Sequence, residues 1–557
     1  MPGTHKWFPL VQETLSVDSL ASMAVLLNSA DVPRYTRVNT VTNIMESHYY
    51  LYLGLALVSL LVVLGKKRQH AAAHNGGLRL PPGPWQLPII GSAHHMLGQL
   101  PHRAMRDLAR RHGPVMLLRV GEVATVVVSS REAAREVMKT HDTAFASRPL
   151  SPTLAAYSSG GRDIICAPYG DHWRQLRKIA VTELLSARRV LSFRRIRKEE
   201  VAAMLRAVAA ESTTSSRAGA VLQMRGRLTA LVSDITVRAV VGDRCRERDL
   251  FVRQVDTINQ LVAGFNPVDL WPSSRLARFF SSAVRRVEEC RETAFRILDG
   301  IIKEHLEKLQ DKEADEAEED LLDVLLKIQR EGGLPIPLDM DVIKSVVLDI
   351  FAAGSETSST VLEWTMAELI RNPKAMQRAT AEVRGAFSAR GTVTEQALGE
   401  LRYLHLVVRE TMRLHAPVPL LLPREAREHC RVLGYDVLPG TTVVVNAWAL
   451  GRDERYWPGD PEEFRPERFE EAGDVDFKGT DFELLPFGSG RRMCPGVAFG
   501  LAKVELTLAS LLFHFDWEAP GVANPAELDM TEAFGITARR KSGLLVRPIL
   551  RVPVPGV

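Results

Sequence analysis

Residues 487–496 read FGSGRRMCPG and place one cysteine, Cys494, in a loop of glycines and arginines near the C-terminus. Glycines such as Gly488 let the backbone fold tightly around the sulfur and let a flat ring approach it closely. Arginines such as Arg492 lower the pKa of a neighbouring thiol and can pair with carboxylates. A cysteine beside a tight turn can also be buried and inert, but the whole loop favours a thiolate that ligates a metal.

The residues after this loop indicate a helix whose N-terminus faces the sulfur. Pro495 suits a first helical turn, and residues 497–508 are largely apolar and helix-forming. The amide groups and the positive end of the helix dipole would then lie near Cys494. A thiolate held in this way is what a haem iron uses when it activates dioxygen rather than carrying it.

A second motif, AGSETS at residues 353–358, lies inside a long apolar run at 338–370 that predicts a helix. Its hydroxyl groups can bond back to main-chain carbonyls and open the helix locally. Thr357 offers a hydroxyl group, and Glu356 offers a carboxyl group that can relay protons. Taken alone, the motif also fits a helix with a few polar residues facing solvent.

Three further charged motifs are weak signals when each is taken alone. Glu410 and Arg413 are spaced i, i+3 and share a helix face, where such pairs are common and contribute little on an exposed surface. FRPERF at residues 464–469 is an aromatic and charged turn. Trp173 and Arg177 are spaced i, i+4, so they also lie on one helix face, which fits a basic amphipathic helix equally well.

Together these motifs resemble those of a known family. The pattern Phe-x-x-Gly-x-Arg-x-Cys-x-Gly of the first loop resembles the haem-binding signature of the cytochrome P450 family. The other motifs follow the order that this family shows, and the resemblance extends from about residue 81 to residue 548. The segments PRE at 423–425 and FGIT at 534–537 are similar to those of the plant A-type group, which oxidises specialised metabolites.

The resemblance implies a mainly α fold with a small β region and a haem b whose iron is ligated by Cys494. It assigns further haem contacts to Arg492, Trp173, Arg177, Phe487 and Gly488. It gives Thr357 and Glu356 the catalytic role in oxygen activation.

The resemblance also implies a structural network and a substrate pocket. Glu410, Arg413 and Arg468 would form a buried charge network that supports the thiolate side of the haem. The expected pocket residues are Phe351, Ala352, Val418, Leu421 and Ile536. Because most of these side chains are aliphatic and none is charged, the pocket predicts an apolar substrate.

The expected activity is that of a microsomal haem-thiolate monooxygenase. Electrons would come from NADPH through a separate flavoprotein reductase, and dioxygen would be the second substrate. We favour a terpenoid, either a sesquiterpene or a diterpene, while phenolic lipids, indoles and oximes stay open. A haem-thiolate isomerase or dehydratase that uses no dioxygen is disfavoured by Glu356 and Thr357, and a non-catalytic haem protein is the other alternative.

Composition excludes several other classes of protein. The chain has 557 residues, of which 46% are hydrophobic and 25% are charged, as in an ordinary globular protein with a large core. A net charge of +4 without interleaved basic and aromatic residues gives no indication of nucleic-acid binding. The cysteines lack CxxC spacing and suit a reduced, cytosol-facing domain without disulfides or structural zinc; they are Cys166, Cys245, Cys290, Cys430 and Cys494.

The N-terminal part predicts a membrane anchor. Residues 49–65 carry no charge and are followed directly by basic residues 66–68, so a single span would leave the catalytic domain in the cytosol, at the endoplasmic reticulum membrane. A cleaved signal peptide, with a small-residue site at 71–73, is the alternative, but its basic residues should precede the apolar run. The expected organisation is a leader of open status at 1–44, the anchor and its basic stop at 45–68, a proline-rich hinge at 69–88 and the catalytic domain at 89–557.

Local patterns predict several elements of this domain. Residues 123–129, 441–445 and 544–546 are rich in β-branched and aliphatic residues and predict strands. Residues 195–210 and 284–308 predict helices. The acidic run at 311–320 predicts a solvated loop.

Overall fold

The computed structural model describes residues 77–214, 221–242, 245–263, 265–310, 319–471, 473 and 475–556, together with Tyr52 and Gly54. The predicted leader, nearly all of the anchor and most of the acidic run lie outside the described residues. The domain boundaries proposed from the sequence therefore stay predictions. Residues 77–557 form one compact unit.

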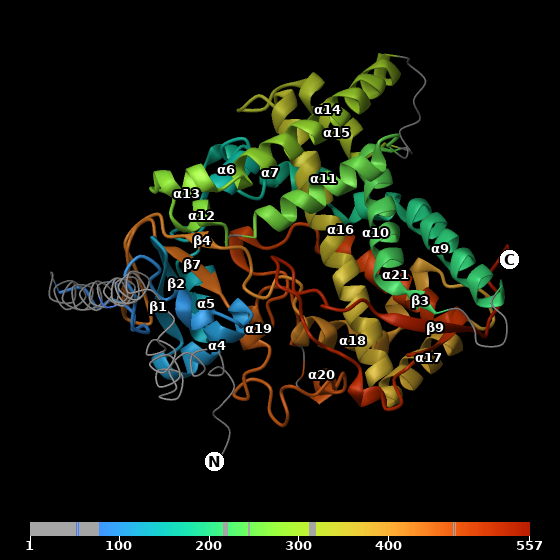
Figure 1. The fold of residues 1–557 in the computed structure, drawn as a ribbon. Coiled ribbons are helices and arrows are strands. Elements are labelled where there is room, and N and C mark those ends of the chain that lie inside the picture. Colours follow the sequence, from blue (N-terminus) through green and yellow to red (C-terminus); the bar gives the residue numbers. More distant parts are fainter. Residues whose placement is uncertain are drawn as a thin grey trace, which may run out of the picture. The chain divides into compact units, whose positions relative to one another are not determined.

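The helix α16 (Met340–Arg371) runs through the middle of this unit (Figure 1). It begins after Asp339, whose side chain accepts a hydrogen bond from the Val342 amide and so caps the helix. Most of its residues are buried on every side, as expected of a helix at the centre of a large protein. The helix α10 (Met224–Val241) packs along it, and α21 (Val497–His514) also packs against it.

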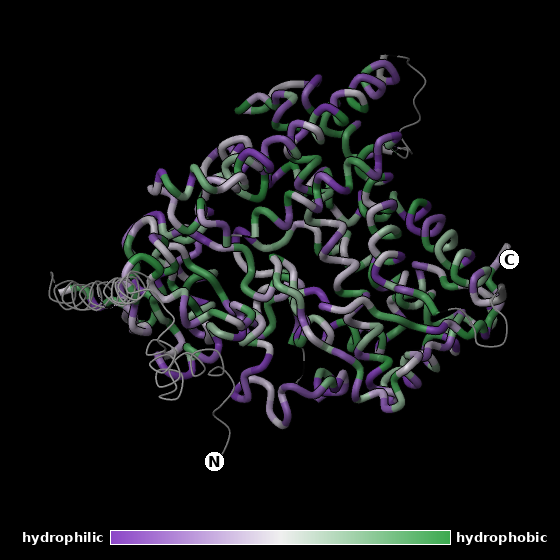
Figure 2. The backbone as a smooth tube through the Cα atoms, viewed as in Figure 1, coloured by the Kyte–Doolittle hydropathy of each residue, from purple (hydrophilic) through white to green (hydrophobic). Residues whose placement is uncertain are grey.

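The remaining helices surround this centre, with α14 and α15 at the top of Figure 1. Their bounds are α4 (Pro101–His112), α5 (Arg131–Arg135), α6 (Pro152–Tyr157), α7 (Asp171–Ile179), α8 (Ala187–Ser192), α9 (Arg194–Thr214), α11 (Arg248–Leu261), α12 (Pro267–Leu270), α13 (Arg275–Phe280), α14 (Ala283–Gln310), α15 (Leu321–Glu331), α17 (Pro373–Phe387), α18 (Arg402–Leu414), α19 (Ala447–Leu450) and α20 (Arg468–Glu471). Hydrophobic and hydrophilic turns mix along the outer helix α9 (Figure 2), as expected for a helix with one face in solvent.

The strands form small sheets at the two sides of the helical core. A four-stranded sheet has the order β1 (Val115–Val120), β2 (Val123–Val128), β7 (Thr442–Val445) and β4 (Arg424–Glu425). In it β2 and β7 are parallel, and the other pairs are antiparallel. A three-stranded sheet has the order β3 (Leu222–Gln223), β9 (Leu545–Leu550) and β8 (Phe515–Glu518), and a hairpin joins β5 (Cys430–Val432) to β6 (Tyr435–Val437).

The predicted elements agree closely with the structure. The strands expected at 123–129 and 441–445 are β2 and β7, which run side by side, and residues 544–546 lead into β9. The helices expected at 195–210, 284–308 and 338–370 are α9, α14 and α16; α9 and α14 are longer than predicted by a few residues, and α16 begins two residues later and ends one residue later. The mainly α fold with a small β region is therefore confirmed.

Within the described residues, one helix is long and apolar enough to cross a membrane. That helix is α21, and 67% of its 18-residue window is buried inside the protein. Such burial is typical of a core helix, and α21 packs on α16 and α17.

A buried charge network links α18 to α20. Glu410 accepts hydrogen bonds from Arg413 at 2.6 and 2.8 Å and from Arg468 Nε at 2.8 Å. All three side chains are at most 3% exposed. Arg413 also donates to the carbonyls of Gly451 and Pro461, so the network ties α18 to the loop before α20.

Replacing Glu410 by glutamine should destabilise the protein strongly. Glu410→Gln keeps the size of the side chain but leaves Arg413 and Arg468 buried without a negative partner. Breaking a buried ion pair from one side costs about 3–5 kcal/mol, so we expect the free energy of unfolding in denaturant to fall by that amount. The control is Glu471→Gln, because Glu471 is 61% exposed and pairs with Arg465 at the surface; its effect should stay below about 1 kcal/mol. Equal effects of the two changes would contradict the prediction.

Candidate active site

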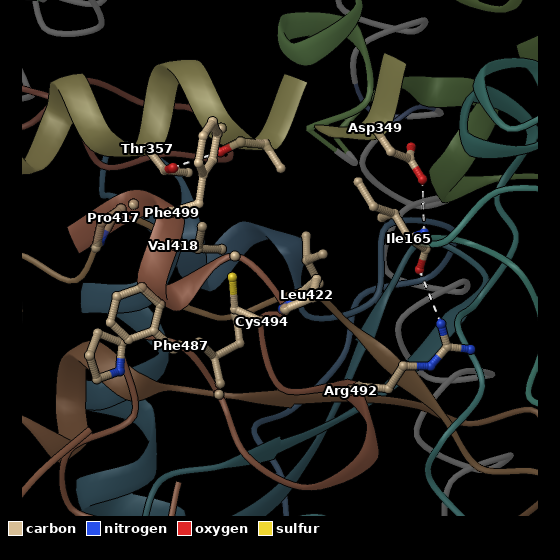
Figure 3. Close-up of a pocket in the computed structure, with 18 of the residues that line it drawn as sticks. Ile165, Asp349, Thr357, Pro417, Val418, Leu422, Phe487, Arg492, Cys494 and Phe499 are labelled. Atoms are coloured by element: carbon tan, nitrogen blue, oxygen red, sulfur yellow. Dashed lines mark hydrogen bonds between the residues drawn. The ribbon is translucent and has the colours of Figure 1, made fainter. Parts of the chain in front are cut away.

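A cavity of about 260 Å³ lies between α16, α21 and the loop that carries Cys494. Its surface is mostly apolar, and the walls come from segments far apart in the sequence (Figure 3). The lining includes Ile164, Ile165, Thr357, Pro417, Val418, Leu421, Leu422, Phe487, Cys494 and Phe499.

The cysteine loop is shaped by glycine and by close packing. Gly490 has φ +70°, and a Cβ atom there would lie 2.2 Å from the Met138 carbonyl oxygen, so only glycine fits. The Cys494 amide donates to the Phe487 carbonyl at 2.9 Å, which closes the loop. The side chain of Cys494 then points into the cavity toward α16 (Figure 3).

The Cys494 thiol is exposed only to this interior cavity, because protein surrounds it. Burial raises the pKa of the thiol, while the Gly496 amide and the positive charges of Arg177 and Lys503 oppose the rise. These opposing groups stabilise the thiolate, the form that binds a metal.

Four arginines line the same cavity, and they lack enough negative partners. Arg148, Arg177, Arg424 and Arg492 all contribute to its wall. In the described part of the chain only Arg424 pairs with a carboxylate, Asp142, at 3.1 Å. Burial and the charge of Arg424 lower the pKa of Arg492 to about 9, and burial, Arg492 and Arg424 also lower the pKa of Arg148. This wall therefore favours an anionic ligand.

The donor set fits a haem. A haem offers an iron for one soft sulfur ligand and two propionate groups for guanidinium donors. Cys494 supplies the sulfur within one mostly apolar cavity. The positive charge comes from the arginine wall, which consists of Arg148, Arg177, Arg424 and Arg492. These residues are the ones that would hold the cofactor.

All six residues predicted from the sequence to contact the haem line this cavity. Arg492 lies over the ring of Trp173 at 4.2 Å, and Arg177 donates to the Met493 carbonyl at 2.5 Å. Phe487 and Gly488 also line the cavity. The indole N–H of Trp173 is donated to the Ile164 carbonyl at 3.1 Å, so this N–H already has a protein partner. The direct cofactor contact of each residue stays a prediction.

The two predicted catalytic residues face different cavities. Thr357 lines the cavity of Cys494, and its hydroxyl donates to the Ala353 carbonyl at 2.6 Å (Figure 3). Glu356 lines a second, more polar cavity of about 340 Å³. There it accepts hydrogen bonds from Thr537 Oγ1 at 2.5 Å and from Asn259 Nδ2 at 3.4 Å. The role of Glu356 in proton transfer stays a prediction.

The predicted substrate residues are divided in the same way. Val418 and Leu421 lie in the wall of the Cys494 cavity. Phe351, Ala352 and Ile536 instead line the second cavity, so the structure does not bring them together with Cys494. The helical repeat explains the division. Positions 350, 353, 354 and 357 of α16 face the first cavity, whereas 351, 352, 355 and 356 face the second.

Sequence reasoning missed Asp349, which lines the Cys494 cavity from α16. Its carboxylate accepts hydrogen bonds from the amides of Ile164 at 2.8 Å and Ile165 at 3.1 Å, and from the Tyr157 hydroxyl at 2.6 Å. Burial, followed by the charge of Asp163, raises the pKa of Asp349 well above its ordinary value. The sequence feature that could have identified Asp349 is that it is the one acidic residue in an otherwise apolar stretch, VVLDIFA at residues 346–352.

The peptide at 164–165 is held from its other side by the arginine wall. Arg492 Nη1 donates to the carbonyls of Ile164 and Ile165 at 3.4 Å, and Arg148 Nε donates to Ile165 at 3.4 Å. Figure 3 shows Ile165 between Asp349 and Arg492. The peptide thus links the carboxylate of α16 to the arginines, while its side chains line the cavity. Arg148 and Arg424 were also missed, because neither belongs to a contiguous haem motif.

Replacing Asp349 by asparagine should loosen this peptide. Asp349→Asn replaces one of the two acceptor oxygens by an amide group, and a buried donor left without its acceptor costs about 1–3 kcal/mol. We therefore expect amide hydrogen exchange in a peptide covering 157–167 to become about 10- to 100-fold faster, measured by mass spectrometry. Asp341→Asn on the same helix is the control, since Asp341 is 60% exposed. Unchanged protection in Asp349→Asn would show that the carboxylate does not hold the loop.

Comparison with known proteins supports the same cofactor. Residues 81–545 match the family model described as Cytochrome P450. Zealexin A1 synthase of Zea mays is 47% identical over 90% of this chain and 98% of its own length. Premnaspirodiene oxygenase of Hyoscyamus muticus is 45% identical over 89% of this chain and 96% of its own length. A solved zebra fish cytochrome P450 with progesterone shares the fold, with a TM-score of 0.68 and 26% identity, over 80% of this chain and 99% of that structure.

Proposed function

The chain belongs to the cytochrome P450 family and is a monooxygenase. From this premise we propose that it hydroxylates an apolar terpenoid with a sesquiterpene or diterpene skeleton. The observation that carries the proposal is the apolar wall of the cavity that Cys494 lines. It is built from Ile164, Ile165, Val418, Leu421 and Leu422. Relatives of the chain include terpenoid-oxidising enzymes such as Zealexin A1 synthase and Premnaspirodiene oxygenase, which supports this substrate class.

The overall reaction balances with one external electron donor. One C–H bond of the substrate, one dioxygen, one NADPH and one proton give one C–OH group, one water and NADP⁺. The bound haem supplies the activation of dioxygen. The two electrons of NADPH would arrive through a separate flavoprotein reductase.

The residues of this chain have distinct tasks in that reaction. Cys494 ligates the iron, and the arginine wall neutralises the propionates of the haem. The aliphatic side chains orient the substrate and exclude water, which prevents side reactions. Thr357 presents a hydroxyl group in the same cavity, where it can hold a proton for transfer.

The location of the enzyme is a further part of the proposal. Residues 45–68 would anchor it in the endoplasmic reticulum membrane, with the catalytic domain in the cytosol. The uncharged run at 49–65 followed by three basic residues supports this orientation. An apolar substrate dissolved in the membrane would then be close to the enzyme.

A substrate panel tests the proposed class. The full chain is incubated in microsomes with a plant reductase, NADPH and separate sesquiterpene, diterpene, phenolic lipid, indole and oxime substrates. We expect a product heavier by one oxygen atom from a terpene, with loss of the product when NADPH is omitted. Turnover of an indole, oxime or phenolic lipid, but of no terpene, would replace the proposal by that alternative. Conversion without NADPH and dioxygen would indicate an isomerase or dehydratase.

Replacing Thr357 by alanine should uncouple the reaction. Thr357→Ala removes a hydroxyl group that lines the Cys494 cavity and donates to the Ala353 carbonyl, and positioned proton donors contribute about 10²–10⁴-fold to rate. We expect product formed per NADPH to fall about tenfold or more while hydrogen peroxide release rises. Thr365→Ala is the matched control, because Thr365 lies on the same helix and donates to Val361 in the same i−4 manner but lines neither cavity. Tight coupling in Thr357→Ala would remove this residue from the mechanism.

A further inference from the structure

A second functional candidate, Lys503, lies on α21 and has no assigned role in the site above. Its side chain is fully buried and lines the Cys494 cavity. The ammonium group donates to the Gly354 carbonyl of α16 at 2.6 Å and to Thr236 Oγ1 of α10 at 3.2 Å. It also lies over the Phe499 ring at 4.1 Å. One amine therefore joins three helices at the cavity.

The amine of Lys503 differs from two other fully buried cations of the core, which have carboxylate partners. Arg197 pairs with Glu395 at 2.6 Å, and Arg413 pairs with Glu410. Across the described ranges, Lys503 makes no ion pair with a carboxylate. Burying a charge without a partner costs stability, and such a residue in a cavity is a candidate for a functional role.

The carbonyl that Lys503 binds belongs to the turn that carries Thr357. The Thr357 hydroxyl donates to the carbonyl of Ala353, and Lys503 donates to that of the next residue, Gly354. Carbonyl oxygens have two lone pairs, so each can accept a side-chain donor besides its helical partner. A Cβ atom at Gly354 would lie 3.5 Å from both Lys503 Nζ and Thr236 Cγ2. These are ordinary contact distances, so the ammonium and the Thr236 methyl group pack directly against this face of the turn.

We propose that Lys503 is a positioning residue for oxygen activation, whose ammonium fixes the turn of α16 that carries Thr357 against the helix that follows Cys494. Thr236 completes the link, since its own hydroxyl donates to Val232 and so ties the amine to α10. This inference deepens the proposed function and rests on the monooxygenase reaction, but it does not depend on which substrate is oxidised.

The hydrogen bond from Lys503 to the Gly354 carbonyl should weaken as pH rises through neutrality. Burial and the charge of Arg197 lower the pKa of Lys503 to about 7, and a thiolate at Cys494 opposes the change. Below that pH the charged amine donates strongly to Gly354, whereas above it only a neutral amine remains. Because an unfolded lysine titrates near pH 10.4, the unfolded chain binds more protons between about pH 7 and 10. The contribution of Lys503 to stability therefore rises with pH over that range.

The test compares Lys503→Met, which keeps length but removes charge, with Lys503→Arg and with the surface control Lys374→Met. Each holoprotein is first checked for a normal reduced carbon-monoxide spectrum. Hydrogen exchange of a peptide covering 350–358 is then measured at pH 6.5 without substrate. We expect at least tenfold faster exchange in Lys503→Met only. We also expect the wild-type melting temperature to rise, relative to Lys503→Met, between pH 7 and 9.

Coupling of NADPH to product gives the functional readout. Product per NADPH should fall several-fold in Lys503→Met and should stay near the wild-type value in Lys503→Arg and Lys374→Met. The proposal would be overturned if Lys503→Met and Lys503→Arg both showed the same exchange at 350–358 and the same coupling as the wild-type protein. If Lys503→Met does not fold, Lys503→Gln is measured in its place, and wild-type exchange at 350–358 in that variant would overturn the proposal. If no terpene is oxidised in the substrate panel, the exchange result still stands, because the exchange is measured without substrate.

Discussion

The site depends on an excess of positive charge that the protein does not neutralise itself. Four guanidinium groups face one cavity, and among the described residues one carboxylate, Asp142, pairs with them. Main-chain carbonyls hold the groups in place: Arg492 donates to Ala146 and Ala167, and Arg148 donates to Leu422 and Pro423. This arrangement costs stability until an anionic ligand arrives. The fold is therefore organised in advance for a cofactor that carries carboxylates.

Local patterns predicted the fold well because its main elements have strong local signals. The β-branched run before residue 129 forms β2, and the long apolar run after residue 338 forms α16. The site was predicted where its residues are contiguous, as in the loop of Cys494 and Arg492. Asp349 escaped prediction because its partner Ile164 is 185 positions away in the chain, and no local pattern reports such a contact.

The two faces of α16 explain the other differences between expectation and structure. Family resemblance treats the residues of a motif as one group, yet consecutive helical residues point about 100° apart. Glu356 and Thr357 thus face separate cavities, as do Phe351 and Ile350. Counting positions in steps of three and four from Thr357 would have separated the two sets from the sequence alone.

The backbone and the side chains of residues 164–165 have separate roles. Its amides and carbonyls connect Asp349 to the arginines, whereas the two isoleucine side chains face the cavity. Any residue except proline supplies the same amide and carbonyl groups. Mutation can therefore reshape this wall during evolution, and so change which compound fits, without disturbing the bonds that keep the cofactor site in place. A family of enzymes built in this way can diversify its chemistry at small risk to its fold.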